Sequence, residues 1–117
     1  MSHATLLSKS LKGIVWSADL VSAARAMKDE NIGALGVYSS DGHDLLGVIT
    51  ERDISHAVAQ GLDLSRTRVG RVMTDTLLTA EGPITPEEAS NLMHAGHVRH
   101  LIIRQDGSDR IVSIRDL

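Results

Sequence analysis

The chain has 117 residues, 42% of them hydrophobic, which suits one compact domain or two very small half-domains and excludes a disordered chain. A net charge of −3, without a cluster of basic and aromatic residues, argues against a nucleic-acid groove. The chain has no cysteine and no apolar stretch long enough for a membrane span or a signal peptide, so we expect a soluble, cytoplasmic protein without disulfides.

The N-terminal half begins with a helix and a hairpin. Residues 19–30 carry apolar side chains at helical spacing behind Asp19, which is a favourable N-cap residue. Residues 32–38 and 45–49 are short apolar runs separated by a turn rich in serine, aspartate and glycine. This pattern predicts a β-hairpin after the first helix.

A second helix is expected over residues 51–60, with Thr50 at its start and Gly61 just past its end. Residues 62–72 are short and mostly polar, and they indicate a linker. The first unit is therefore predicted to span residues 1–61.

The pattern then starts again, so residues 73–117 are predicted to form a second unit. Thr85 begins a helix with a proline at its first position, and Gly96 ends it. Residues 98–103 and 111–114 follow as strands of another hairpin.

The two halves align as an internal repeat. When Met27 is placed over Met93, the segment GVITERDI (47–54) lies over RIVSIRDL (110–117). Each half alone buries too little surface to be stable, so the two are expected to share a core about a pseudo-twofold axis. The alternative is a chance similarity of two helix–hairpin units.

These motifs resemble a known family. GVITERDI and IVSIRDL are similar to the closing signature of CBS (cystathionine-β-synthase) domains, with Arg110 in place of the glycine in the second copy. GHVRHL (96–101) resembles the strand entry of a second CBS repeat, and VGRVMT (69–74) resembles its usual opening. The resemblance covers nearly the whole chain as one tandem pair, often called a Bateman module.

The resemblance implies an α+β fold of two tandem βαββα-type CBS repeats packed about a pseudo-twofold axis, with two clefts at their interface. Such modules commonly form homodimers, bind AMP, ATP, NAD or S-adenosylmethionine, and regulate an attached or partner protein. The family's last helix normally continues past the final aspartate, whereas this sequence stops at Leu117. We therefore expect the C-terminal helix to be missing, which places the second cleft in doubt.

Thr50 and Asp53 lie where a strand ends and a helix begins, a place that favours acceptor oxygens. The resemblance implies that the aspartate accepts hydrogen bonds from a ribose and that the threonine contacts sugar or phosphate. The alternative is that the two residues only cap the helix. Ser113 and Asp116 are their counterparts in the second repeat.

Arg99 and His100 lie at the start of the second repeat's strand, where the resemblance implies contact with a nucleotide phosphate. An arginine suits this task because its planar guanidinium binds phosphate oxygens bidentately. The alternative is a surface arginine beside a half-buried strand histidine. The corresponding first-repeat residues, Gly33 and Ala34, carry no charge, so the Thr50/Asp53 cleft is predicted to bind more tightly.

Three further residues are candidate ligand contacts. Arg52 precedes Asp53 and is able to reach a phosphate, although such residues are more often solvated helix starts. The backbone from Ile14 to Trp16 is expected to border the adenine, and the Trp16 ring either stacks on the base or belongs to the core.

The sequence contains no catalytic motif. It lacks a nucleophile elbow, a Gly-rich phosphate loop and an HExxH motif, and the spaced histidines around Gly96 do not share a helical face, so no metal site is expected. We predict a non-catalytic sensor that binds an adenine nucleotide as a regulatory ligand, forms a homodimer and acts on an unidentified protein. The alternatives are a structural dimerisation module without ligand and a regulatory fragment of a larger enzyme or transporter.

Overall fold

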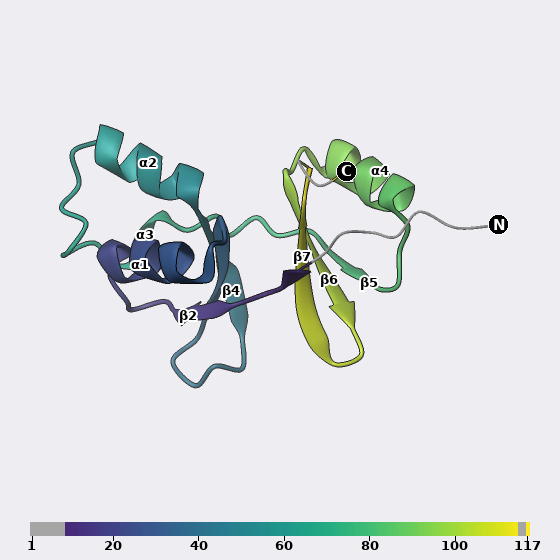
Figure 1. Ribbon diagram of the computed structural model, residues 1–117, viewed down its shortest axis with the longest axis horizontal. Coiled ribbons are helices and arrows are strands. Elements are labelled where there is room, and N and C mark those ends of the chain that lie inside the picture. Colours follow the sequence, from purple (N-terminus) through teal and green to yellow (C-terminus); the bar gives the residue numbers. More distant parts are fainter. Residues whose placement is uncertain (1–8, 115–116) are drawn as a thin grey trace. The chain divides into compact units, whose positions relative to one another are not determined.

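The computed structural model describes residues 9–114 and 117, which fall into two compact units. One unit comprises residues 12–76, and the other joins residues 9–11 with the described residues from 77 onward. Each unit combines a small β-sheet with helical packing on one face (Figure 1). The α+β fold class predicted from the sequence is confirmed.

The unit of residues 12–76 contains a three-stranded sheet with the order β2-β3-β4. Strand β2 (Gly13–Val15) runs parallel to β3 (Ala34–Tyr38), and β3 pairs in antiparallel fashion with β4 (Leu45–Thr50). Gly42 adopts a φ of 79° in the hairpin turn, a left-handed conformation that glycine reaches without strain. The predicted hairpin is therefore present.

Helices α1 (Leu20–Glu30) and α2 (Glu51–Ala59) lie on the same face of this sheet (Figure 1). Helix α1 begins where predicted, because the Asp19 side chain accepts a 2.8 Å hydrogen bond from the backbone N–H of Ser22. The core is aliphatic and is formed by Leu20, Ala23, Met27, Leu35, Val37, Ile49, Ala57 and Val69.

The segment expected to be a linker, residues 62–72, is packed in the structure. It contains the short helix α3 (Val69–Val72), and Val69 is fully buried in the core of this unit. The carbonyl oxygens of Leu64 and Thr67 accept hydrogen bonds from the backbone N–H of Leu20. Alternating apolar residues tie this mostly polar stretch to the first repeat, so the contact unit extends to residue 76.

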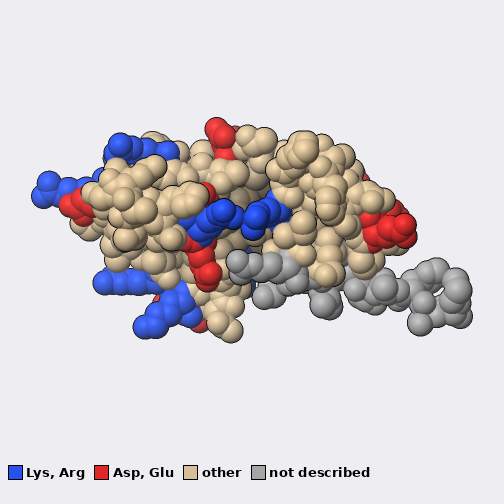
Figure 2. All heavy atoms as spheres, turned by 90° about the horizontal axis from the view of Figure 1, so that it is seen from above, with Lys and Arg blue, Asp and Glu red and all other residues tan. Residues whose placement is uncertain are grey.

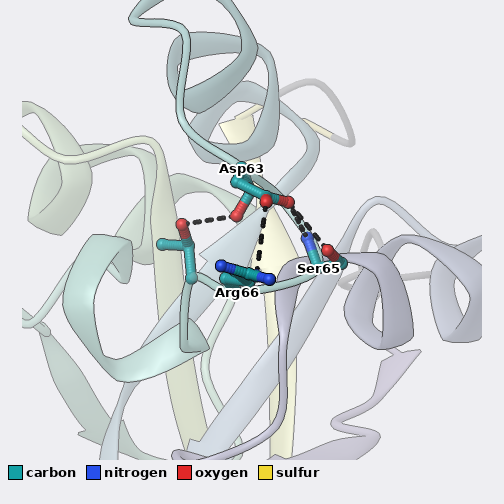
Figure 3. Close-up of polar contacts among 4 residues, drawn as sticks. Asp63, Ser65 and Arg66 are labelled. Atoms are coloured by element: carbon teal, nitrogen blue, oxygen red, sulfur yellow. Dashed lines mark hydrogen bonds and ion pairs between the residues drawn. The ribbon is translucent and has the colours of Figure 1, made fainter.

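A network of local hydrogen bonds shapes the turn after α2 (Figure 3). The Asp63 carboxylate accepts from the backbone N–H and the hydroxyl of Ser65, at 3.1 and 2.7 Å, and lies 3.8 Å from Nε of Arg66. The Thr67 hydroxyl donates to the carbonyl oxygen of Asp63 at 2.7 Å. These bonds satisfy Thr67, a buried polar residue, and hold the chain in position to enter α3.

The other unit contains a four-stranded sheet with the order β1-β7-β6-β5. Strand β5 (Thr79–Glu81) is parallel to β6 (His100–Gln105), whereas β7 (Ser108–Ser113) is antiparallel to both β6 and β1 (Lys9–Ser10). Helix α4 (Pro86–Gly96) packs against this sheet.

The boundaries of α4 follow the predicted signals. The Thr85 hydroxyl accepts a 3.1 Å hydrogen bond from the backbone N–H of Glu88, and Pro86 occupies the first turn. The chain leaves the helix through His97, which has a left-handed φ of 53°. The core of this unit is again aliphatic, with Ala89, Met93, Leu101, Ile103 and Val112.

Strand register confirms that the two units are copies of one another. Ala34 pairs with Thr50 in the first hairpin, and His100 pairs with Ser113 in the second. The sequence alignment places Ala34 over His100 and Thr50 over Ser113. The repeat predicted from the sequence is therefore reproduced in register from Ala34 to Val37 and from His100 to Ile103, beyond which a register shift after Val37 ends the match.

In each unit the second hairpin strand also pairs with a distant segment. Val48 forms an antiparallel bridge with Thr74, and Ile111 pairs with Lys9 of β1. Each of these segments leads along the chain into the other half. The pairing of β1 with β7 explains why residues 9–11 group with the second repeat and not with the first.

The surface carries both signs of charge. On the face shown in Figure 2, acidic and basic side chains occur in small groups and form no extended field of one sign. Within the described part of the chain, no helix is long and apolar enough to cross a bilayer.

Candidate functional site

The candidate site of the first repeat is built on the junction between β4 and α2. Thr50 is the last residue of β4 and the N-cap of α2, and its hydroxyl accepts a 3.1 Å hydrogen bond from the backbone N–H of Asp53. In return, Oδ2 of Asp53 accepts from the backbone N–H and the hydroxyl of Thr50, at 2.9 and 3.0 Å. Thr50 and Asp53 therefore form the capping box that the sequence predicts.

Capping does not use the whole carboxylate. An ionised carboxylate has about four acceptor positions on its two oxygens. Both bonds from Thr50 end on Oδ2 of Asp53, whereas among the described residues Oδ1 accepts only from the hydroxyl of Thr74, at 3.2 Å. Asp53 also remains partly exposed, so Oδ1 retains acceptor capacity for a bound molecule.

Thr74 is the site residue that sequence analysis missed. Its backbone N–H and carbonyl exchange hydrogen bonds with Val48 at 2.8 and 2.9 Å, which brings it beside the start of α2. This approach requires Gly47, because a Cβ atom there would lie 2.7 Å from the Thr74 carbonyl oxygen and 2.8 Å from the sulfur of Met73. A glycine inside a strand often marks the close approach of another backbone segment. Gly47, which the second repeat replaces by Arg110, was therefore the sequence signal of this contact.

The first repeat offers no charge at its strand entry. The carbonyl oxygen of Gly33 accepts a 3.0 Å hydrogen bond from the backbone N–H of Glu51, and Ala34 is buried at the start of β3. Arg52 lies on the exposed side of the first turn of α2. Its guanidinium makes no hydrogen bond or ion pair with residues 9–114 or 117.

Arg99, His100 and Ser113 come together at one end of the β6–β7 hairpin. The carbonyl oxygen of Arg99 accepts a 2.8 Å hydrogen bond from the backbone N–H of Ile114, and His100 pairs with Ser113. The Arg99 side chain is exposed and has no hydrogen bond or ion pair within the part of the chain that is described. Asp116, the predicted partner of Ser113, lies outside the described residues.

These residues fall into two sets. Thr50 and Asp53 belong to the unit of residues 12–76, and Arg99, His100 and Ser113 belong to the other unit. The association of Asp53 with Arg99 in one nucleotide site therefore stays a prediction.

Ile14 and Trp16 both pack against the core of the first repeat. Ile14 pairs with Val37 across the parallel strands. The indole nitrogen of Trp16 donates a 3.1 Å hydrogen bond to the Ser40 hydroxyl, and the guanidinium of Arg68 lies 5.3 Å from the ring centroid. Arg68 thus occupies one side of the ring through a cation–π contact.

The histidines near the end of α4 do not converge. Nδ1 of His94 lies 2.8 Å from the carbonyl oxygen of Ser90 in the same helix, while His97 follows the helix end. Among residues 9–114 and 117, no three histidine, cysteine, aspartate or glutamate side chains are grouped so that they could hold a metal ion.

Comparison with known proteins identifies relatives of this architecture. The CBS domain family model matches residues 17–60. CBS domain-containing protein YhcV from Bacillus subtilis is 37% identical over 97 residues, which cover 81% of this chain and 67% of that protein. The chain therefore spans about two thirds of the length of this relative.

Solved structures show the same fold. The CBS-domain containing protein ATU1752 from Agrobacterium tumefaciens has a TM-score of 0.78 and 29% identity, covering 92% of this chain and 81% of that one. The CBS domain protein PAE2072 from Pyrobaculum aerophilum, solved in complex with AMP, has a TM-score of 0.79 and 24% identity, covering 96% and 86%. With its duplicated hairpins and these relatives, the chain belongs to the CBS domain family.

Proposed function

We propose that this chain is a non-catalytic regulatory module that binds an adenine nucleotide, with AMP as the simplest ligand. In this proposal Thr50 and Asp53 hold the ribose, Arg99 and His100 contact the phosphate, and Arg52 adds positive charge. The backbone from Ile14 to Trp16 borders the adenine. The AMP complex of the related fold from Pyrobaculum aerophilum supports this choice of ligand.

The observation that carries the proposal is the state of the Asp53 carboxylate. It lies at the N-terminus of α2, with Oδ2 used by Thr50 and, within residues 9–114 and 117, Oδ1 bonded only to the exposed hydroxyl of Thr74. A negatively charged acceptor repels phosphate but binds hydroxyl donors, for which a sugar is the natural source. The carboxylate therefore suits the ribose of a nucleotide.

The phosphate requires a positively charged group elsewhere. Arg99 is exposed and makes no ion pair with the described residues, so binding a phosphate breaks no ion pair with any of them. A charge-assisted hydrogen bond contributes about 1.5–3 kcal/mol, which corresponds to about tenfold or more in affinity. We assign the weaker second site to Ser113 and Asp116, because the strand entry of the first repeat, Gly33 and Ala34, carries no charge.

Calorimetric titration of AMP and adenosine into four variants tests this proposal. Asp53→Ala should abolish most affinity, and Arg99→Ala should weaken AMP about tenfold while changing adenosine less than about twofold. Asp116→Ala should have little effect. Glu88→Ala is the matched control, because Glu88 occupies the same third position of α4 behind its N-cap, Thr85.

Three results would contradict parts of the proposal. Equal affinity for AMP and adenosine would remove the phosphate contact. A damaging Asp116→Ala with a silent Asp53→Ala would transfer the main site to the second repeat. A loss of affinity in Glu88→Ala as large as that in Asp53→Ala would mean that helix capping, and not ligand contact, explains the effect.

A specific observation also favours self-association. Val58 on α2 is 58% exposed, whereas Ala57 of the same helix is buried in the core. We propose that α2 takes part in a homodimer interface. Light scattering that shows only monomer across micromolar concentrations would contradict this.

A further inference from the structure

The hydroxyl of Thr74 lies beside the Asp53 carboxylate and is shared between its two oxygens. The distances from Oγ1 of Thr74 are 3.2 Å to Oδ1 and 3.3 Å to Oδ2. Both exceed the usual O–H···O range of about 2.5–3.0 Å, so the bond is weak. The Thr74 side chain is also exposed, which makes its hydroxyl accessible to a ligand.

The position of this hydroxyl is set by the main chain. Thr74 is held by the two backbone hydrogen bonds to Val48, and Gly47 allows the segments to approach. The hydroxyl bond to Asp53 is therefore not needed to keep Thr74 in place.

The arrangement provides two neighbouring acceptors. Thr50 already uses Oδ2 of Asp53, which leaves Oδ1 and, 3.2 Å away, the lone pairs of the Thr74 hydroxyl. A hydroxyl that donates to a carboxylate is polarised and becomes a better acceptor. A cis-diol presents two O–H donors side by side, so it matches this pair better than a single hydroxyl does.

We infer that Thr74 is a ligand-contacting residue that, together with Asp53, selects a cis-diol sugar, and so distinguishes a ribonucleotide from its deoxy analogues. This inference rests on the proposed nucleotide binding and adds a residue and a specificity to it. One ribose hydroxyl donates to Oδ1 of Asp53, and the other donates to Oγ1 of Thr74.

Calorimetric titration with AMP, 2′-deoxy-AMP and 3′-deoxy-AMP tests the inference. Thr74→Val removes the hydroxyl but keeps the branched shape and the backbone bonds, so its thermal unfolding should be unchanged. It should weaken AMP about three- to tenfold, the range expected for one lost hydrogen bond. It should also bind one of the two deoxynucleotides as tightly as the wild type does, because that nucleotide lacks the same contact.

Two further variants serve as controls. Thr74→Ser keeps the hydroxyl and should retain the preference for AMP. Thr76→Val makes the same substitution two residues along the chain, at another exposed threonine without a hydrogen bond in the described residues, and should leave all affinities unchanged.

Two outcomes would overturn the inference while leaving nucleotide binding intact. Thr74→Val could keep the full wild-type preference for AMP over both deoxynucleotides. It could also bind AMP more tightly than the wild type, which would show that the Thr74 hydroxyl competes with the ligand for Oδ1. If the wild type binds none of the three nucleotides, the proposed function itself fails, and this inference with it.

Discussion

Replacement of Gly47 by alanine should separate the chain segment at residues 73–74 from strand β4. The new Cβ atom would lie 2.7 Å from the carbonyl oxygen of Thr74, a distance that real Cβ atoms do not adopt. The neighbouring atom on the main chain cannot rotate away as a flexible side chain would. The segment must therefore move, and the two backbone hydrogen bonds between Val48 and Thr74 are weakened or lost.

The cost follows from those two bonds. Each contributes about 0.5–1.5 kcal/mol, so their loss destabilises the folded state by about 1–3 kcal/mol. The alanine also lowers the conformational entropy of the unfolded chain, which offsets about 0.4–1 kcal/mol of this destabilisation. The midpoints of these two ranges give a free energy of unfolding that is about 1.3 kcal/mol lower for Gly47→Ala.

Urea denaturation followed by tryptophan fluorescence measures this change, because the chain has a single tryptophan, Trp16, in the same unit. Gly33→Ala is the matched control. A Cβ atom there would lie 3.5 Å from the Glu51 carboxyl carbon, an ordinary contact with a flexible side chain. Gly33→Ala should be neutral or slightly stabilising. A Gly47→Ala variant as stable as the wild type would refute the reasoning.

Three further predictions concern other parts of the chain. Arg68→Ala should remove the cation–π contact with Trp16, lowering the free energy of unfolding by about 0.5–1 kcal/mol and shifting the fluorescence; an unchanged urea midpoint would contradict this. The hydrogen bond from the backbone of Ser22 lowers the pKa of Asp19 below its usual 3.8, so this carboxylate stabilises the fold above that pH and loses its effect as the pH falls further. The melting temperature of Asp19→Asn should therefore fall less at acidic pH than that of the wild type. The same fall in both proteins would exclude this contribution. Val58→Glu should dissociate the proposed homodimer in light scattering, and an unchanged mass would exclude α2 from the interface.

The larger elements could be predicted because their signals are local. Asp19, Thr50 and Thr85 each lie directly before a periodic apolar run, and each caps the helix expected there. The hairpins follow from short apolar strands around turns with glycine. The alignment of Met27 with Met93 then predicted which positions of the two repeats are equivalent, and strand register agrees.

The missed elements depend on distant partners. Strands β1, β2 and β5 have only two or three residues each, too few to show a period, and they exist because they pair with segments far along the chain. Helix α3 has only four residues, too few to show a helical period, and it lies in a mostly polar stretch. Thr74 was missed for the same reason, since no local pattern links it to Asp53, 21 residues away.

Thermal unfolding of the wild type and of Asp53→Ala at rising AMP concentration tests the central claim most directly. A ligand that binds only the folded state adds about 2.7 kcal/mol of stability at a hundred times its dissociation constant. We expect the melting temperature of the wild type to rise with AMP and that of Asp53→Ala to stay constant. No rise in the wild type at millimolar AMP, or an equal rise in both proteins, would contradict nucleotide binding at Asp53.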